Sequence, residues 1–187
     1  MTRLVLASGN PHKAQELTRL LPGHSVEPWV GELPEETGDT FLDNARLKAR
    51  HVHAAVGPAW VIADDSGIEA AALGGAPGVR SARYAGEHAT DQENLAKLLA
   101  TLAGLDDRRV AYVAQLVAID PDGRELLARG ELRGTLAGEP RGSGGFGYDP
   151  AFVPEGETRT VGEMSAGEKD AISHRARAAA ELLPQLP

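Results

Sequence analysis

The chain has 187 residues, of which 42% are hydrophobic, and it carries a formal net charge of -8 without a single cysteine. This length suits one domain over residues 1–187 with a hydrophobic core large enough to fold without a disulfide or a structural metal. The lack of cysteine excludes thiol chemistry and fits a reducing cytoplasm. The negative charge argues against nucleic acid as a partner, and no apolar window reaches membrane-spanning length, so no membrane partner is expected.

Periodicity and punctuation predict a mixed series of elements. In chain order these are a strand at 3–7, helices at 10–21 and 40–56, a strand at 60–63, a helix at 89–102, strands at 110–119 and 125–136, and a helix from 168 to about 183. Asn10 is a typical helix cap, and Pro11 suits a first helical position. In the second helix, Asn44 and Lys48 lie four residues apart, and we expect them on a solvated face away from the apolar stripe. The order of elements indicates an α/β fold.

The segment between the first strand and the first helix is a candidate phosphate site. It reads Ser8-Gly9-Asn10-Pro11-His12-Lys13. A helix N-terminus presents backbone N–H groups and the positive end of the helix dipole, which together attract anions. Gly9 permits close approach of a ligand, and Lys13 adds a cation one turn into the helix. The alternative is an ordinary helix cap with a solvated lysine, since the segment is neither a Walker loop nor a GxGxxG fingerprint.

Two adjacent acids, Asp64 and Asp65, follow the short strand that is expected to end at Ala63. Ligands often bind at the carboxyl ends of strands in α/β proteins. Paired carboxylates suit Mg²⁺, which takes oxygen ligands from one or two acids and from substrate phosphate. The alternative is that the two acids cap a turn. Glu36 offers a further carboxylate before the second helix, although the helix dipole alone favours an acid there.

The C-terminal third holds side chains suited to a nucleobase. Phe146 lies within a glycine run, and an aromatic ring flanked by glycines can stack on a base. Lys169, His174 and Arg175 follow on the last predicted helix, where the last two can donate to a carbonyl oxygen of a purine. A solvated helix face is the alternative explanation for these three residues.

Taken together and in this order, the segments resemble the non-canonical purine NTP pyrophosphatase family, also known as the inosine triphosphate or dITP/XTP pyrophosphatases. Six blocks spread over nearly the whole chain carry the resemblance. They are Ser8-Gly9-Asn10 with Lys13 and Glu16, Glu36-Thr37-Gly38 through Lys48-Ala49, Ala63-Asp64-Asp65-Ser66-Gly67, Gly74-Gly75-Ala76-Pro77-Gly78 with Ser81-Ala82-Arg83-Tyr84, Gly145-Phe146-Gly147-Tyr148-Asp149-Pro150, and Glu168-Lys169 with Ile172-Ser173-His174-Arg175. Asp43 departs from the family, which often has Glu there.

The resemblance implies an α/β fold with an elongated, mixed and twisted sheet, flanking helices, two lobes around a central cleft, and a homodimer. It implies Mg²⁺ as cofactor, served by Glu36 and Asp65 with Asp64 as a third candidate ligand, and Asp65 as the general base. The implied substrate contacts are Ser8, Gly9, Asn10, Pro11, His12 and Lys13 for the phosphates, Ser66 for the substrate, and Phe146, Gly147, Tyr148, Asp149, Lys169, His174 and Arg175 for the nucleoside.

The implied reaction splits ITP, dITP or XTP between the α and β phosphates and releases a monophosphate and pyrophosphate. Two alternatives stay open. The first is a pyrophosphatase of related fold that prefers dTTP or UTP, which would differ in its base pocket. The second is a noncatalytic nucleotide sensor, which is disfavoured because paired acids beside a phosphate loop repel each other unless a cation joins them.

Overall fold

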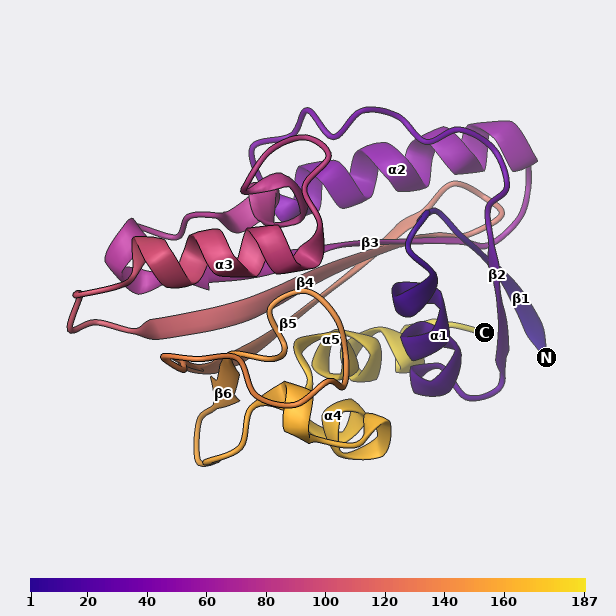
Figure 1. Ribbon diagram of the computed structural model, residues 1–187. Helices are drawn as coiled ribbons and strands as arrows, with labels where there is room; N and C mark the ends of the chain where they lie inside the picture. The colour runs from indigo at the N-terminus through magenta and orange to yellow at the C-terminus, as the bar shows by residue number, and fades with distance from the viewer. The chain divides into compact units, whose positions relative to one another are not determined.

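A computed structural model describes all residues from 1 to 187 (Figure 1). The chain forms two compact units. Unit 1 comprises Met1–Asp65, Ala114–Gly130 and His174–Pro187, and unit 2 comprises Ser66–Val113 and Glu131–Ser173. The six strands form one sheet in the order β2-β1-β3-β4-β5-β6, with parallel pairing of β1 to β2 and β3 and antiparallel pairing of β5 to β6. The predicted mixed α/β fold is therefore confirmed, whereas a single domain over 1–187 stays a prediction.

Three strands contribute residues to both units. They are β3 (Val61–Ala70), β4 (Arg109–Ile119) and β5 (Glu125–Leu136). The last two, which the sequence predicted at 110–119 and 125–136, follow each other through a turn in which the Gly123 N–H donates to the Asp120 carbonyl oxygen.

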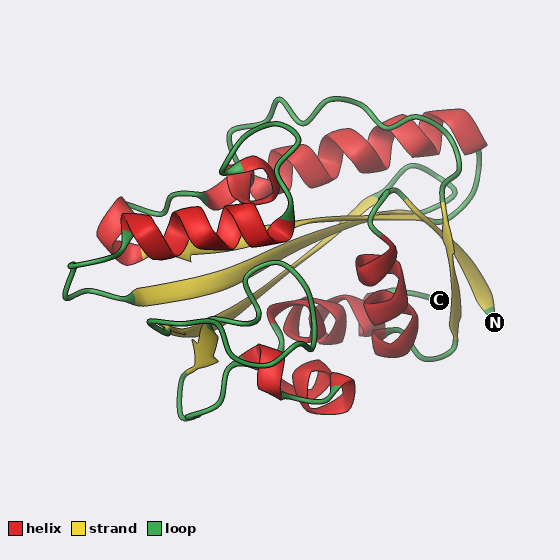
Figure 2. Cartoon of the chain, in the orientation of Figure 1, coloured by secondary structure: helices red, strands yellow, loops and turns green.

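Unit 1 contains two further strands and three helices. They are β1 (Thr2–Leu6), α1 (Pro11–Leu20), β2 (His24–Pro28), α2 (Phe41–Val56) and α5 (His174–Leu182), which runs into a 3-10 turn at Leu183–Gln185. Alternate β1 side chains serve opposite faces, because successive strand residues point to opposite sides. Leu4 and Leu6 pack with α1 and α5, while Val5 packs with α2. Figure 2 shows α1 and α5 on one side of β1 and α2 on the other.

Unit 2 has its own hydrophobic core. Its elements are the 3-10 turns Ala71–Leu73, Gly78–Arg83 and Val161–Glu163, the helices α3 (Asp91–Thr101) and α4 (Ala166–Ile172), and the strand β6 (Phe152–Pro154). Helix α3 begins at a capping box of Thr90 and Glu93, which satisfies orphan N–H groups. Its buried Leu95 and Leu98 pack with Val110 of β4. None of the helices in the chain combines the length and apolar composition that a membrane crossing requires.

The prediction of a short strand at 60–63 was wrong at its carboxyl end. Strand β3 continues to Ala70, so Asp64 and Asp65 lie inside a strand and not after one. Both carboxylates are buried against cationic side chains, so their charges do not terminate the strand. The apolar alternation resumes at Ile68 and Ala70, which are fully buried.

The predicted final helix is two helices. Ser173 ends α4 in an extended conformation, with φ -63° and ψ 155°, and α5 begins at His174. Gly130 in β5 explains where α5 begins, since a Cβ there would overlap the His174 carbonyl oxygen. The short strands β2 and β6 were not predicted, because each has a proline and too few residues for a visible alternation.

Candidate active site

The loop between β1 and α1 is a capped helix N-terminus, as predicted. The Asn10 side-chain oxygen accepts the N–H groups of His12 at 2.9 Å and Lys13 at 3.4 Å, and Pro11 occupies the first turn. The Ser8 hydroxyl oxygen accepts the N–H of Asn10 at 3.2 Å. Two backbone N–H groups of the first turn are thus already bonded to Asn10 and are not available to a phosphate. The positive group that this segment can offer a phosphate is the Lys13 ammonium.

Lys13 belongs to a buried chain of ion pairs in unit 1. Its ammonium lies 2.5 Å from Asp64 Oδ1, and the other Asp64 oxygen accepts the Arg175 Nε–H at 2.8 Å. The Arg175 guanidinium also pairs with Glu16, and only 1% of its side chain is exposed. Asp64 is therefore held between two cations. This geometry favours a role in orienting Lys13 and Arg175 over direct metal ligation, which stays a prediction for Asp64.

A second ion-pair cluster joins helix α2 to β3. The Lys48 ammonium donates to Glu36 Oε1 at 2.6 Å and to Asp65 Oδ1 at 2.9 Å. Lys48 and Asp65 are buried, whereas 28% of the Glu36 side chain is exposed. The prediction of a solvated face for Asn44 and Lys48 was wrong, because Asn44 is fully buried and its oxygen accepts the Gly38 N–H at 2.7 Å.

Burial and mutual charge shift the pKa of each group in these clusters. Burial alone would raise the pKa of Asp64, but Arg175 and Lys13 hold it well below its ordinary value. Burial raises the pKa of Asp65, which Lys48 offsets only in part. Burial lowers the pKa of Lys13, whereas the two acids beside Lys48 overcome its burial and raise its pKa. Asp64 is thus a fixed anion, and Asp65 is the acid of the pair that more readily takes up a proton.

The residues around Asp65 fit a magnesium ion. Asp65 Oδ2 is buried and has no hydrogen-bond partner, and a buried acceptor without a donor is unfavourable unless a cation serves it. Across the two clusters, four acids face three cations: Glu16, Asp64, Asp65 and Glu36 against Arg175, Lys13 and Lys48. The partnerless Asp65 oxygen and the nearby Glu36 carboxylate suit Mg²⁺, which uses one or two carboxylates and takes its other ligands from phosphate and water.

Unit 2 gathers the aromatic and cationic residues predicted to bind the nucleoside. Asp149 is buried, and its Oδ2 accepts the Lys169 ammonium at 2.7 Å and the Phe146 N–H at 2.9 Å. The Lys169 ammonium lies 4.5 Å from the centroid of the Phe146 ring, within the range of a cation–π contact. Phe146 itself is partly exposed. The structure therefore brings these three predicted residues together.

The remaining predicted residues divide between the units. Tyr148 is buried, and its hydroxyl donates to the Ser81 carbonyl oxygen at 2.7 Å, while the Gly147 N–H donates to Asp91 at 2.8 Å. Ser66 follows Asp65 in β3 and opens unit 2. His174 is buried at the start of α5 in unit 1. Its predicted role in reading the base, together with Arg175, stays a prediction.

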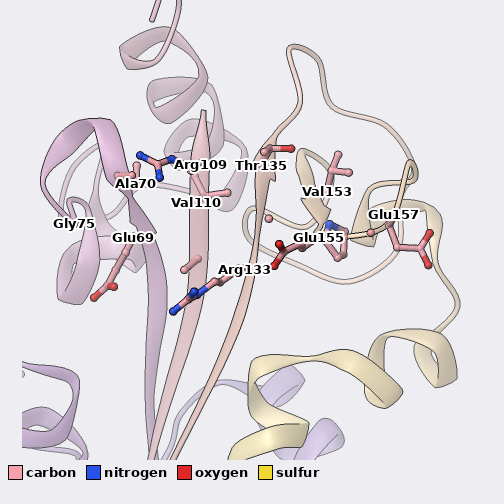
Figure 3. A pocket seen from close by; sticks show the side chains of 15 residues that line it. Glu69, Ala70, Gly75, Arg109, Val110, Arg133, Thr135, Val153, Glu155 and Glu157 are labelled. Atoms are coloured by element: carbon pink, nitrogen blue, oxygen red, sulfur yellow. The ribbon is translucent and has the colours of Figure 1, made fainter. Parts of the chain in front are cut away.

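A hollow of about 660 Å³ in unit 2 lies apart from all of these residues (Figure 3). Its walls come from β3, β4, β5, β6 and the adjoining turns, and they include none of the predicted site residues. Arg109 and Arg133 lie among its acids, but both are mostly exposed and already paired with Asp107 and Glu131. The hollow therefore lacks the buried polar groups that would define a second site.

Lys48 and Tyr112 contact predicted site residues, although the sequence indicated no site role for either. The burial of Lys48 could have been predicted from the sequence. Asn44 and Lys48 continue, at helical spacing, the buried stripe of Phe41, Ala45 and Val52. Tyr112 had no such signal, because an aromatic residue in a strand is most simply a core residue. In the structure its hydroxyl donates to Asp149 Oδ1 at 3.0 Å.

Fold and site together define an α/β protein with a capped helix N-terminus next to a buried acid–lysine cluster. The chain matches the Ham1 family model over residues 4–185, and it belongs to the Ham1 family. It is 50% identical to a protein of Mycobacterium bovis named dITP/XTP pyrophosphatase, over 100% of this chain and 96% of that relative. A protein of the same name from Streptomyces coelicolor is 47% identical, over 98% of this chain and 96% of its own length. The resemblance seen in the sequence is thus confirmed.

Solved structures agree with this assignment. The Staphylococcus aureus Ham1 protein superposes with a TM-score of 0.88 at 37% identity, covering 98% of this chain and 97% of that chain. A structure from Mycobacterium abscessus described as a nucleoside-triphosphatase and dITP/XTP pyrophosphatase gives a TM-score of 0.77 at 42% identity, covering 98% of this chain and all of that one.

Proposed function

We propose that this chain is a Mg²⁺-dependent nucleoside triphosphate pyrophosphatase that hydrolyses ITP, dITP and XTP to the monophosphate and pyrophosphate. The observation that carries the proposal is the pair of Asp65 oxygens. One is bound to Lys48 at 2.9 Å, and the other is buried without a hydrogen-bond partner. A carboxylate in this state is ready to accept a proton or serve a cation. Relatives named dITP/XTP pyrophosphatase at about half identity over full length support the enzyme class.

The chain supplies the groups that hydrolysis of a phosphoanhydride needs. Asp65 orients a water molecule and takes its proton, and its raised pKa makes it a better base than an exposed aspartate. Lys13 and Lys48 provide positive charge for the phosphates, and Asp64 holds Lys13 in place. Glu36 and Asp65 would hold Mg²⁺, which would supply positive charge for the leaving pyrophosphate. Attack at the α phosphorus then releases pyrophosphate in one piece, without a covalent enzyme intermediate.

Selectivity for the purine base of the substrate follows from hydrogen-bond chemistry. Donors aimed at a purine 6-oxo group pair with hypoxanthine and xanthine but face another donor in the 6-amino group of adenine. Lys169 is held beside the Phe146 ring, which is the proposed stacking surface for the base. His174 and Arg175 are the further candidate donors. Guanine shares the 6-oxo group, so its exclusion must come from position 2 of the ring.

Pyrophosphate release from a panel of nucleotides tests the proposal. We expect ITP, dITP and XTP to be hydrolysed in the presence of Mg²⁺ with kcat/KM well above those for ATP and GTP, and we expect EDTA to stop turnover. Preference for dTTP or UTP would identify the related-fold pyrophosphatase instead. Tight nucleotide binding without any turnover would identify a sensor.

Two further expectations belong to this proposal. The resemblance to the family predicts a homodimer, which sedimentation velocity of the purified chain tests. The cytoplasmic location is supported by the absence of cysteine from a chain of this length. Fractionation of cells that express the chain tests that location.

A further inference from the structure

Tyr112 contacts the predicted nucleoside loop, residues 146–149, through Asp149, and no step described so far uses it. It stands in β4 and is 7% exposed. Its ring stacks on Phe152 with centroids 4.4 Å apart and an interplanar angle of 20°. Its hydroxyl donates to Asp149 Oδ1 at 3.0 Å. The ring is thus fixed by packing on one strand residue, and its polar end is directed at one carboxylate.

That carboxylate connects the parts of the loop. Asp149 accepts the Tyr112 hydroxyl on one oxygen and both the Lys169 ammonium and the Phe146 N–H on the other. Gly145 leaves room for it, because a Cβ there would overlap Asp149 Oδ2. The Lys169 ammonium and the Phe146 N–H therefore share one carboxylate oxygen, and a rotation of that carboxylate would move the acceptor of both.

Of the three donors to Asp149, only Tyr112 belongs to a long strand. Phe146 stands in a loop, and Lys169 stands in α4, which has seven residues. The terminal torsion of an aspartate is broad and roughly two-fold, so rotamer preference alone does not fix its carboxylate plane. A donor on a packed strand supplies the missing constraint. Burial, followed by the charge of Asp149, raises the pKa of Tyr112 well above its ordinary value, so the hydroxyl keeps its proton.

We propose that Tyr112 is a positioning residue for nucleoside binding, acting through Asp149 to set the Phe146 ring and the Lys169 ammonium. The inference rests on the proposed function, since it concerns binding of the same nucleotides. It assigns Tyr112 to substrate affinity and not to the hydrolytic step, because its hydroxyl bonds to Asp149 and its ring stacks on Phe152, both in unit 2, whereas Asp65 and Lys48 lie in unit 1.

The decisive variant is Tyr112→Phe, which removes one oxygen and keeps the ring stacked on Phe152. We expect the KM for ITP to rise about threefold to tenfold, the range of one hydrogen bond of ordinary strength, with kcat within about twofold of wild type. Tyr84→Phe is the matched control, since Tyr84 is partly buried, its hydroxyl donates to Thr101 at 3.4 Å, and it lies outside the loop. It is expected to leave both constants unchanged.

A double-mutant cycle with Asp149→Asn tests the route of the effect. If Tyr112 acts through Asp149, Tyr112→Phe adds little to the KM of the Asp149→Asn variant, because the two changes are coupled. Thermal melting of each variant checks that it is folded. An unchanged KM in folded Tyr112→Phe, a loss confined to kcat, or fully additive effects would each overturn the inference. Absence of turnover of any nucleotide by the wild-type chain would instead reject the proposed function.

Discussion

At the scale of single residues, Asp65 has the central role in the proposed hydrolysis. Asp65→Asn keeps the shape of the side chain but removes the base and one negative charge. We expect kcat for ITP to fall about 10²- to 10⁴-fold, the usual loss for a general base, while ITP still binds. Asp107→Asn is the control, because Asp107 is paired only with Arg109 at the surface. Near-normal kcat of Asp65→Asn at saturating Mg²⁺ would remove Asp65 from the reaction.

Lys48 gives a second residue-scale prediction. Lys48→Met leaves Glu36 and Asp65 close together without their shared cation, so their charges repel. Removing one partner of a buried ion pair costs about 3 to 5 kcal/mol of unfolding free energy. We expect Mg²⁺ to raise the melting temperature of Lys48→Met more than that of wild type, because the ion replaces the ammonium.

The control for Lys48 is Arg46→Met in the same helix. Arg46 pairs with Glu125 at 2.9 Å but is 29% exposed, so its loss is expected to cost little and to leave the Mg²⁺ response as in wild type. Equal Mg²⁺ responses in Lys48→Met and Arg46→Met would show that Glu36 and Asp65 do not attract the ion.

The lowered pKa of Asp64 predicts how the free energy of unfolding depends on pH. Its pKa in the folded chain lies well below the ordinary value of 3.8, so it contributes stability that is present above pH 3.8 and lost as the pH falls toward the folded pKa. The limiting slope is about 1.4 kcal/mol per pH unit for this one group. Urea unfolding between pH 5 and 3 is expected to give a shallower acid loss for Asp64→Asn than for wild type. If the unfolding free energies of Asp64→Asn and wild type fell in parallel between pH 5 and 3, Asp64 would not have a lowered pKa in the folded chain.

The residue types of the site were predictable, but the partners of Lys48 were not. Adjacent acids and a lysine after a helix cap carry a chemical meaning that the sequence shows directly. Burial of Lys48 depends on Glu36 and Asp65, which lie 12 and 17 residues away, so only the folded chain brings them together. The same holds for Tyr112 and Asp149, which are 37 residues apart.

At the scale of elements, Gly130 determines where α5 can pack. Gly130→Ala places a Cβ against the His174 carbonyl oxygen and the Ala178 backbone nitrogen, so the first turn of α5 must shift. We expect a loss of unfolding free energy of about 1 to 3 kcal/mol, the usual range for overpacking. Activity is expected to fall as well, because α5 carries His174 and Arg175.

Gly138→Ala is the matched control for this change. A Cβ at Gly138 meets nothing within 4 Å, and its backbone is not in the left-handed region. The two variants are compared by their melting temperatures, measured by circular dichroism, and by their kcat/KM for ITP. A Gly130→Ala variant as stable and active as Gly138→Ala would show that α5 tolerates displacement.

Element boundaries were predictable where local chemistry sets them. Helices α1 and α2 begin at the predicted residues, because Asn10 and Thr40 cap them through their own side chains. The length of β3 and the break at Ser173 were not predictable. Both depend on contacts with distant segments: cations around the two acids in the first case and the close approach to Gly130 in the second.

At the scale of the whole molecule, the order of six motifs predicted the family, and the matched model over residues 4–185 confirmed it. The division into two units was not visible in the periodicity of the sequence. Each unit is assembled from segments far apart in the chain, and strands β3, β4 and β5 contribute to both. The proposed base Asp65 and the proposed phosphate-binding Lys13 belong to unit 1, and the proposed stacking residue Phe146 belongs to unit 2.

The position of bond cleavage in ITP distinguishes a pyrophosphatase from an enzyme that removes the γ phosphate. Purified chain is incubated with ITP and Mg²⁺, and the products are separated by anion-exchange chromatography, with Asp65→Asn as the inactive comparison. We expect IMP and pyrophosphate in equal amounts from the start of the reaction, with no IDP. Release of IDP and inorganic phosphate would place cleavage at the γ phosphate and contradict it.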